Sequence, residues 1–343
     1  PEDDASPVAA TLAAEFRPVA DGLEITRIYS GDPDLLEERS PLDKPEVGAT
    51  TGDVIVSVNH SPVRDRGELA AALAEQAGQP VLLEIKRPGE ALREVVVQPV
   101  EGKELARLRY RYWERETRAR VDSASDGRIG YLHLYAMGGR DIADFAREFY
   151  SQNDRQGLVI DVRSNRGGNI DSWVIGELAR SAWAFWQMPH ADESYGNRNM
   201  QGAFRGHLVV LIDAFTYSDG ETFAAGIKAL DLAPLIGMRT AGAGIWLTGR
   251  NRLIDGGVAR IAELAQFDLD GNWIVEGYGV EPDIEVDNLP RASWEGRDAQ
   301  LESALEFLEE RIRDAPVPIL RGEPIPPVGV PARDVRRGSA VNP

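Results

Sequence analysis

Residues 158–172 read LVIDVRSNRGGNIDS, an apolar run that leads into a glycine pair. The run from Leu158 to Val162 has the length and the β-branched content of a buried strand. Gly167 and Gly168 then allow a turn whose backbone can approach a ligand closely. We expect a helix to follow over residues 172–184. A buried strand, a glycine turn and a helix in this order are typical of an α/β sheet.

A second stretch, HLVVLIDAFTYSDGETFAA at residues 207–225, repeats the pattern. It predicts a strand over 207–213 and a helix over 221–230, with Ser218 in the turn between them. A helix N-terminus favours developing negative charge at such a serine. Taken singly, the glycine pair is explained by a tight turn and Ser218 by an N-cap. Together, at the carboxyl ends of two strands, the turns favour an acyl-transfer site.

The region around these two stretches reads as one α/β domain. A strand over 129–134 and a helix over 141–150 precede them, so strands and helices alternate along the chain. Such alternation indicates a mostly parallel sheet with helical crossovers. We place this domain at residues 128–314, and we expect the tail 315–343, rich in Pro, Arg and Gly, to be disordered.

Residues 1–101 predict a separate, small, β-rich domain. Strands are expected over 23–29, 53–58, 81–87 and 93–97, with a helix over 68–76. The order of these elements and the segment GDVIVSVN at 52–59 resemble a PDZ domain. This resemblance implies that the domain clamps an extended peptide by β-augmentation. Packing without any bound peptide is the open alternative. Residues 102–127 are strongly charged and predict an amphipathic or extended connector with a solvated face.

Composition excludes several classes of function. The chain has a formal net charge of −18 and no cysteine. Such acidity disfavours contact with nucleic acid, and without cysteine there is no disulfide, thiolate nucleophile or Cys-bound metal. The four histidines lack the i, i+4 spacing of a helical zinc site. We therefore expect no metal and no cofactor. No apolar run approaches the ~20 residues of a membrane span.

Four blocks of the α/β domain resemble a known family. They are GYLHLYAM (130–137), LVIDVRSNRGGNIDS (158–172), FTYSDGETFAAGIKALDLAPLIGMRTAGAG (215–244) and VEGYGVEPDIEV (275–286). In this order they are similar to the catalytic domain shared by carboxyl-terminal-processing proteases and tricorn proteases. The resemblance implies a crotonase/ClpP-like αβ spiral, preceded by the PDZ-like domain, and a serine endopeptidase or oligopeptidase.

The resemblance also assigns roles to residues. Ser218 matches the nucleophile, and the backbone N–H groups of Gly168 and Asp219 match the oxyanion donors. Glu276 matches the glutamate that orients the base system. We expect Asp219 to act through its backbone and not through its carboxylate. In the tricorn branch an aspartate between the two turns selects a basic residue at the cleavage site. Asp192 is the candidate here, and an ordinary acidic loop is the alternative.

The general base separates the two branches. Processing proteases use a lysine in a T-x-G-K-G block, but this sequence has Ala243 at that position. The chain has four lysines, and Lys228, inside the predicted helix, is the one that follows Ser218. The tricorn branch uses a histidine from a segment before the PDZ domain. We therefore expect the base upstream of Pro1, with His133 and His60 as weaker candidates, and little peptidase activity from residues 1–343 alone.

The remaining expectations concern partners and location. The resemblance implies peptide or unfolded-protein substrates and a homohexamer. It also favours the cytoplasm, with the periplasm open because the chain begins at Pro1. Two rival functions remain: a non-catalytic peptide-binding or assembly module, which lacks a base, and a Ser–Lys processing protease, which Ala243 opposes.

Overall fold

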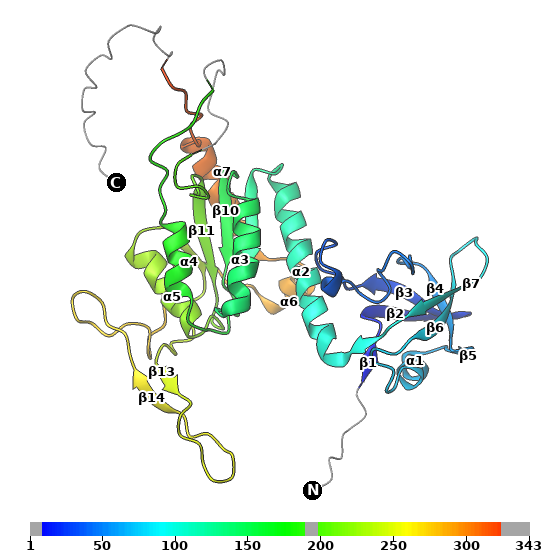
Figure 1. Cartoon of the computed structure of the whole chain (residues 1–343). Helices are drawn as coiled ribbons and strands as arrows, with labels where there is room; N and C mark the ends of the chain where they lie inside the picture. Colours follow the sequence, from blue (N-terminus) through cyan, green and yellow to red (C-terminus); the bar gives the residue numbers. More distant parts are fainter. Residues whose placement is uncertain (1–8, 189–197, 324–343) are drawn as a thin grey trace. The chain divides into compact units, whose positions relative to one another are not determined.

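The computed structural model describes residues 9–188 and 198–323, and it divides into two compact units, residues 1–123 and 124–343. Each unit has its own hydrophobic core. Figure 1 shows a unit of twisted strands at the N-terminal end and an α/β unit after it.

The first unit is built on an antiparallel sheet in the order β2-β3-β4-β6-β7, with the short β5 paired to β4. Its apolar residues alternate along the strands and meet in one core that includes Leu23, Ile55 and Leu83. Asp65 caps helix α1 by accepting a hydrogen bond from the Glu68 N–H. The elements are β1 (Ala10–Thr11), β2 (Ala14–Val19), β3 (Gly22–Ile28), η1 (Leu36–Glu38), β4 (Val54–Val58), β5 (Ser61–Pro62), α1 (Arg66–Ala72), β6 (Val81–Lys86), β7 (Arg93–Val97), β8 (Val100–Glu101) and α2 (Gly102–Ala124).

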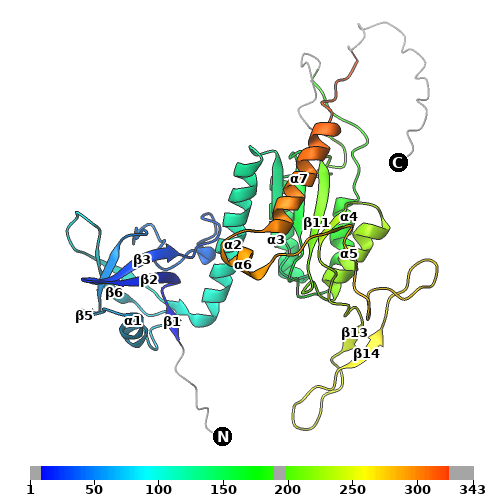
Figure 2. The ribbon, with the colours of Figure 1, turned by 180° about the vertical axis from the view of Figure 1, so that it is seen from behind.

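The second unit holds a five-stranded sheet in the order β15-β12-β11-β10-β9, and every neighbouring pair is parallel. Its helices lie on both faces: α3, α4 and α5 cover one face, and α7 crosses the other (Figures 1 and 2). The elements are β9 (Ile129–His133), α3 (Gly139–Ser151), β10 (Gly157–Asp161), α4 (Asp171–Leu178), β11 (His207–Ile212), α5 (Asp219–Ala229), β12 (Leu235–Gly237), β13 (Trp246–Thr248), β14 (Ile261–Leu264), β15 (Ile284–Glu285), α6 (Pro290–Trp294) and α7 (Ala299–Asp314).

Alternation along the strands explains how both faces of this sheet are buried. Leu158 and Ile160 of β10 pack into the cluster that contains Phe145, Phe149 and Phe223 from the helices of one face. On the other face, a Cβ atom on Gly157 would lie 3.3–3.4 Å from Leu308 and Ile312 of α7. Strands buried on both faces are near-continuous apolar runs, which is why the sequence pattern of 158–162 and 207–212 was so distinct.

One expectation about secondary structure needs correction. Helix α4 ends at Leu178, so the helix expected over 172–184 is too long. Phe185 instead forms an antiparallel bridge with Arg198, and the Asn199 N–H donates to the Ala184 carbonyl. Extended pairing of residues 184–185 is incompatible with a continuing helix. The charged connector is largely one helix, α2. Of the tail 315–343, residues 324–343 lie outside the described residues, and 315–323 contain no helix or strand.

A long excursion between β12 and β15 was not predicted. Residues 245–273, here called the β13–β14 arm, extend away from the parallel sheet (Figure 1). Strands β13 and β14 pair antiparallel, and Phe267 forms a bridge and an edge-to-face ring contact with Trp273.

Candidate active site

The first site feature is the turn that joins β11 to α5. Ser218 sits at the N-cap of α5 with φ 56° and ψ −119°, and its side chain makes no capping hydrogen bond. A positive φ is uncommon for a residue with a side chain, and it persists where the surrounding structure holds it. The same strained geometry exposes nucleophilic serines at other strand-to-helix turns. Capping alone therefore does not account for Ser218.

The glycine pair after β10 packs against this turn. A Cβ atom on Gly167 would lie 2.6 Å from the Cβ of Ser218. A Cβ atom on Gly168 would lie 1.8 Å from the carbonyl oxygen of Met137, with which Gly168 forms a parallel bridge. Both glycines have φ in the range that side chains avoid, +75° and +156°. The structure therefore brings the two predicted turns together and explains why both positions are glycine.

Two backbone amides at these turns find no acceptor in the part of the chain that the structure describes. Among the described residues, neither the Gly168 N–H nor the Asp219 N–H donates a hydrogen bond to a protein acceptor. The Asp219 amide opens helix α5, where the helix dipole adds to its attraction for negative charge. Unpaired N–H groups beside a strained serine are the elements of an oxyanion hole. They belong to Gly168 and Asp219, the two residues that the family resemblance predicts as oxyanion donors.

The carboxylate of Asp219 has a role that the sequence did not predict. It is buried, and its Oδ2 accepts hydrogen bonds from the N–H groups of Ile170, at 2.7 Å, and Asp171, at 3.1 Å. Burial, together with the nearby charge of Asp171, raises the pKa of Asp219 to about 6. The side chain thus ties the start of α5 to the start of α4, directly after the glycine pair.

Glu221 is a further site residue that the sequence analysis missed. Its side chain is fully buried. Oε1 accepts from the N–H groups of Ser218, at 3.1 Å, and Ala243, at 2.8 Å. Oε2 accepts from the Thr240 hydroxyl and the Gly242 N–H, each at 2.6 Å. Four donors around one carboxylate lock the nucleophile turn to the 240–243 loop. The serine and the glutamate three residues later have the spacing of a capping box, which was the available signal.

Glu276 lies on a loop that is joined to the same 240–245 segment. Its Oε2 accepts a hydrogen bond from the Ile245 N–H at 3.0 Å. The next residue, Gly277, donates its N–H to the Gly242 carbonyl at 2.8 Å. Val275 has φ 68°, an outlier for a β-branched residue, so this loop is held in a strained shape. Hydrogen bonds therefore connect the Glu276 loop to Ser218 through Glu221.

Candidate bases within the described residues are engaged elsewhere. The His133 ring is buried, with Nε2 at 3.0 Å from the Arg163 carbonyl. His207 Nε2 lies 2.7 Å from the Ala315 carbonyl. Lys228, near the C-terminal end of α5, contacts the Glu281 carbonyl at 3.0 Å and the Asp283 carboxylate at 2.8 Å. His190 and the specificity candidate Asp192 lie outside the described residues.

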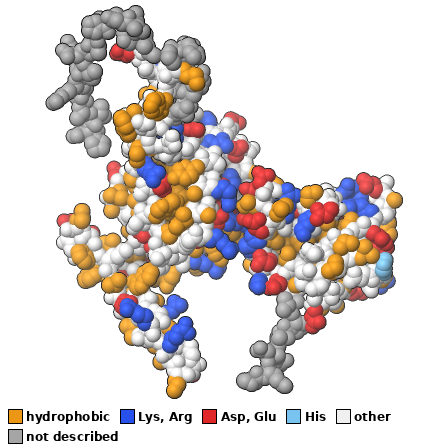
Figure 3. Space-filling view, in the orientation of Figure 1, with side chains coloured by type: hydrophobic (Ala, Val, Ile, Leu, Met, Phe, Trp, Pro, Cys, Tyr) orange, Lys and Arg blue, Asp and Glu red, His pale blue; other side chains and the backbone are white. Residues whose placement is uncertain are grey.

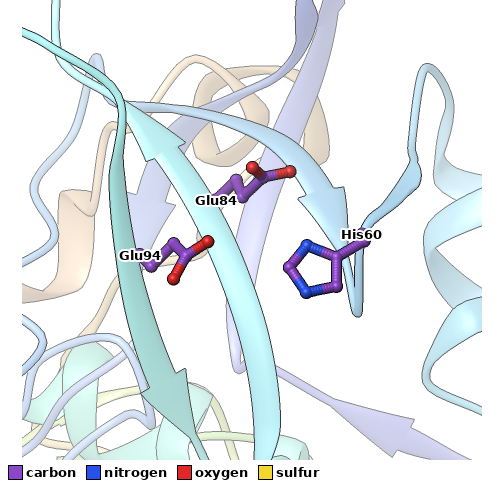
Figure 4. Close-up of side chains that lie close together, drawn as sticks. All are labelled: His60, Glu84 and Glu94. Carbon is purple, nitrogen blue, oxygen red and sulfur yellow. The ribbon is translucent and has the colours of Figure 1, made fainter.

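His60, the other weak candidate, is in the first unit, at the turn between β4 and β5. It lies near Glu84 and Glu94, which face each other across β6 and β7 (Figure 4). Their potential ligand atoms are within 4.8 Å of one another, and His60 and Glu94 are exposed. Imidazole and carboxylate are metal-ligand types. No other feature of the described residues there indicates a cation, and we assign none.

Comparison with known proteins gives consistent matches to both units. Residues 128–286 match the family model of peptidase family S41, and residues 10–102 match the tricorn protease PDZ domain. Tricorn protease homolog 1 of Streptomyces coelicolor is 37% identical over 313 residues, which is 89% of this chain and 28% of the homolog. Tricorn protease of Thermoplasma acidophilum is 30% identical, over 88% of this chain and 28% of that protein. A crystal structure of the tricorn protease aligns with TM-score 0.81 and 30% identity, covering 89% of this chain and 29% of that one.

The parallel sheet, with a serine turn and a glycine turn at neighbouring strand ends, is that of a peptidase catalytic domain of family S41. It follows a tricorn-type PDZ domain, and the chain belongs to the tricorn protease family. The predicted fold class and family resemblance are thus confirmed. The chain spans 28% of the length of these curated relatives. No helix of the described residues has the length and apolar character to cross a membrane.

Proposed function

We propose that this chain carries the nucleophile and oxyanion hole of a tricorn-type serine peptidase. The observation that carries the proposal is the strained Ser218, packed on Gly167 and flanked by the amides of Gly168 and Asp219, which have no acceptor among residues 9–188 and 198–323. A hydroxyl with two available N–H donors in the adjoining turns is suited to attack a carbonyl and to stabilise the resulting oxyanion.

The proposed reaction is hydrolysis of a peptide bond in two steps. Ser218 Oγ attacks the scissile carbonyl and gives its proton to a histidine base, which we place upstream of residue 1 in the longer protein. That proton passes to the leaving amine, and the acyl group stays on Oγ. Water then attacks the acyl-enzyme, releases the second product and restores the serine. Glu276 orients the base system through an intermediary, as a third group does in other triads.

The first test is covalent labelling of Ser218. A fluorophosphonate probe should react with Ser218 in the 343-residue chain, slowly, and rapidly in a longer protein that includes the base. Ser218→Ala should abolish the reaction. Ser164→Ala is the matched control, because Ser164 also has a positive φ, 57°, but is hydrogen-bonded to Asp213. Labelling that persists in Ser218→Ala and disappears in Ser164→Ala would refute the assignment.

A non-catalytic assembly or peptide-binding module is the rival function. It predicts no labelling of Ser218 in any length of the protein, while peptides still bind to the PDZ-like unit. A Ser–Lys mechanism through Lys228 is opposed by the contacts of that lysine with Glu281 and Asp283. Substituting Lys228 by Met should leave the labelling rate unchanged.

We propose peptides and unfolded proteins as substrates, with Asp192 selecting a basic residue at the cleavage site. Support comes from the family and from the acidic sequence around Asp192. In the longer protein, Asp192→Asn should lower kcat/KM for peptides with Arg or Lys at that site more than for Leu peptides. Equal effects on both substrates would remove Asp192 from the proposal.

We also propose self-association, as a homohexamer, and the β13–β14 arm supports it. Apolar side chains are exposed along this arm, and some are visible in Figure 3. They include Trp246, Leu253, Ile254, Ile261, Leu264, Phe267, Leu269 and Trp273. Exposed apolar surface of this extent marks interaction sites. Light scattering should show that Ile254→Asp with Leu269→Asp lowers the mass of the assembly, whereas Leu36→Asp on the first unit does not.

The domain limits and the location belong to the proposal as well. We keep a PDZ-like domain at 1–101, a connector at 102–127 and a catalytic domain at 128–314, and limited proteolysis should cut first near these limits.

For the location in the cell, the resemblance favours the cytoplasm, and fractionation of cells that produce the tagged protein tests this.

A further inference from the structure

One buried carboxylate links the two halves of the oxyanion hole. Asp219 supplies one donor through its own N–H. Its side chain accepts hydrogen bonds from Ile170 and Asp171, the residues that follow the glycine pair closely. The other donor, the Gly168 amide, belongs to that same turn. A single residue therefore carries one donor and restrains the segment that carries the other.

Solubility or ordinary capping within one helix does not explain this carboxylate. Asp219 as a whole residue is 9% exposed, so water contributes little to the solvation of its carboxylate. Helix α4 begins after Ile170, whose side chain makes no capping hydrogen bond. Asp219 provides that cap from a segment 48 and 49 residues away in sequence. Its negative charge also lies at the positive end of the α4 dipole.

The environment of Asp219 includes a second acid. Asp171, at the start of α4, is the charged neighbour that acts on it, and both this charge and burial oppose ionisation of Asp219. Burial and the charge of Asp171 thus disfavour the ionised Asp219 carboxylate, and the two N–H donors hold it in position. Protonation would weaken both hydrogen bonds and loosen the turn that follows Gly168.

We propose that the Asp219 carboxylate is a positioning group for the oxyanion hole, holding the Gly168 turn in register with the Asp219 amide. The proposal deepens, and rests on, the assignment of Ser218 as the nucleophile. It revises the expectation that Asp219 acts through its backbone alone. Asp219 is not itself a proton donor or acceptor in the reaction, and its carboxylate acts through the 167–171 segment.

The first arm of the test needs no enzymatic activity. Amide hydrogen exchange in the 343-residue chain should show protected Ile170 and Asp171 amides in the wild type. Asp219→Leu, which fills the space but accepts no hydrogen bond, should lower their protection at least tenfold. Asp219→Asn, which keeps one acceptor oxygen, should lower it less. Asp231→Asn, an exposed acid after α5, is the control. Unchanged protection in Asp219→Leu would overturn the proposed restraint.

The second arm measures the chemistry at Ser218. In the longer protein we expect Asp219→Leu to lower the fluorophosphonate labelling rate and kcat by ~100-fold, the typical effect of losing one oxyanion donor, with KM nearly constant. The labelling rate of Asp219→Asn should lie between those of the wild type and Asp219→Leu, and it should no longer fall as the pH drops through the pKa of Asp219. In Asp171→Asn this fall in the labelling rate should occur at lower pH, because a like charge next to Asp219 is gone.

The two arms separate the proposal from the proposed function. Lost protection with an unchanged labelling rate would show that Asp219 is merely structural and would overturn the inference, while Ser218 remains the nucleophile. If Ser218 is not labelled in the wild type, the peptidase assignment is refuted. The Asp219 carboxylate would then restrain the 167–171 segment without any catalytic role. If Asp219→Leu fails to fold, Asp219→Asn and Asp171→Asn remain as the test. Unaltered pH profiles of labelling in these two variants would also overturn the inference.

Discussion

The carboxylate of Glu221 accepts a hydrogen bond from the backbone N–H of Ser218 at 3.1 Å, one helical turn after the strained serine. Through its other contacts, the same side chain holds the 240–243 loop. A strained turn needs such fixed partners, because nothing in its own sequence favours the conformation. Among the described residues, no cation pairs with the buried Glu221 carboxylate, and its partners there are hydrogen-bond donors.

This relationship predicts that Glu221→Gln is strongly destabilising. Glutamine offers one acceptor oxygen, and its NH₂ group would face N–H or O–H donors. We expect a loss of about 3 kcal/mol in the free energy of unfolding, measured with urea. Glu281→Gln is the matched control: the Glu281 side chain is 66% exposed, and its change should stay within about 0.5 kcal/mol. Equal losses would mean that the Glu221 contacts contribute little.

The space around two glycines predicts opposite effects on stability when each is replaced by alanine. Gly167→Ala places a methyl group 2.6 Å from the Ser218 Cβ at φ +75°. It should lower stability by at least about 1–2 kcal/mol and slow labelling of Ser218. Gly176→Ala, in α4 with open space around it, should instead stabilise by about 0.5–1 kcal/mol. A neutral Gly167→Ala variant with normal labelling would contradict the packing described here.

Substitution of Glu276 distinguishes a catalytic role of this residue from a structural one. Glu276→Gln keeps an oxygen that can accept from the Ile245 N–H, so folding should change little. The lost charge should lower kcat of the longer protein at least tenfold at constant KM, because nothing then supports the developing imidazolium. Glu281→Gln is again the control. If both variants have wild-type kcat, Glu276 has no part in the base system.

Asp219 predicts a stability cost that depends on pH. Its folded pKa, about 6, lies above the ordinary value of 3.8, so the folded state binds this proton more tightly than the unfolded chain. The resulting stabilisation is fully present below about 3.8 and is lost as the pH rises through about 6. The shift of about two units corresponds to about 1–3 kcal/mol once solvent screening is included.

The measurement is thermal or urea unfolding of Asp219→Asn across this range. At pH 8 the variant should be more stable than the wild type by about 1–3 kcal/mol, since it carries no buried charge. Near pH 4 the two should be similar. A variant that is less stable at pH 8 would show that the hydrogen bonds from Ile170 and Asp171 outweigh the cost of burying the charge.

The local sequence pattern predicted much of the fold and part of the candidate active site. The apolar runs at 158–162 and 207–212 predicted the central strands, because a strand buried on both faces leaves a continuous signal. The turns that follow those strands predicted Gly167, Gly168 and Ser218 as candidate site residues, and the structure packs the two turns together. The length of α4 was not predicted correctly, because pairing between Phe185 and Arg198 overrides the local helical preference.

Sequence alone thus determined the order of the central strands and helices and the residues of the two turns, because these depend on neighbours along the chain. Only the tertiary structure decided which distant groups those turns meet. The donors to Glu221 from residues 240–243 and the donors to Asp219 from residues 170–171 come from separate segments. A buried carboxylate must find such donors wherever the folded chain brings them, and the spacing of residues in the sequence does not show where that is.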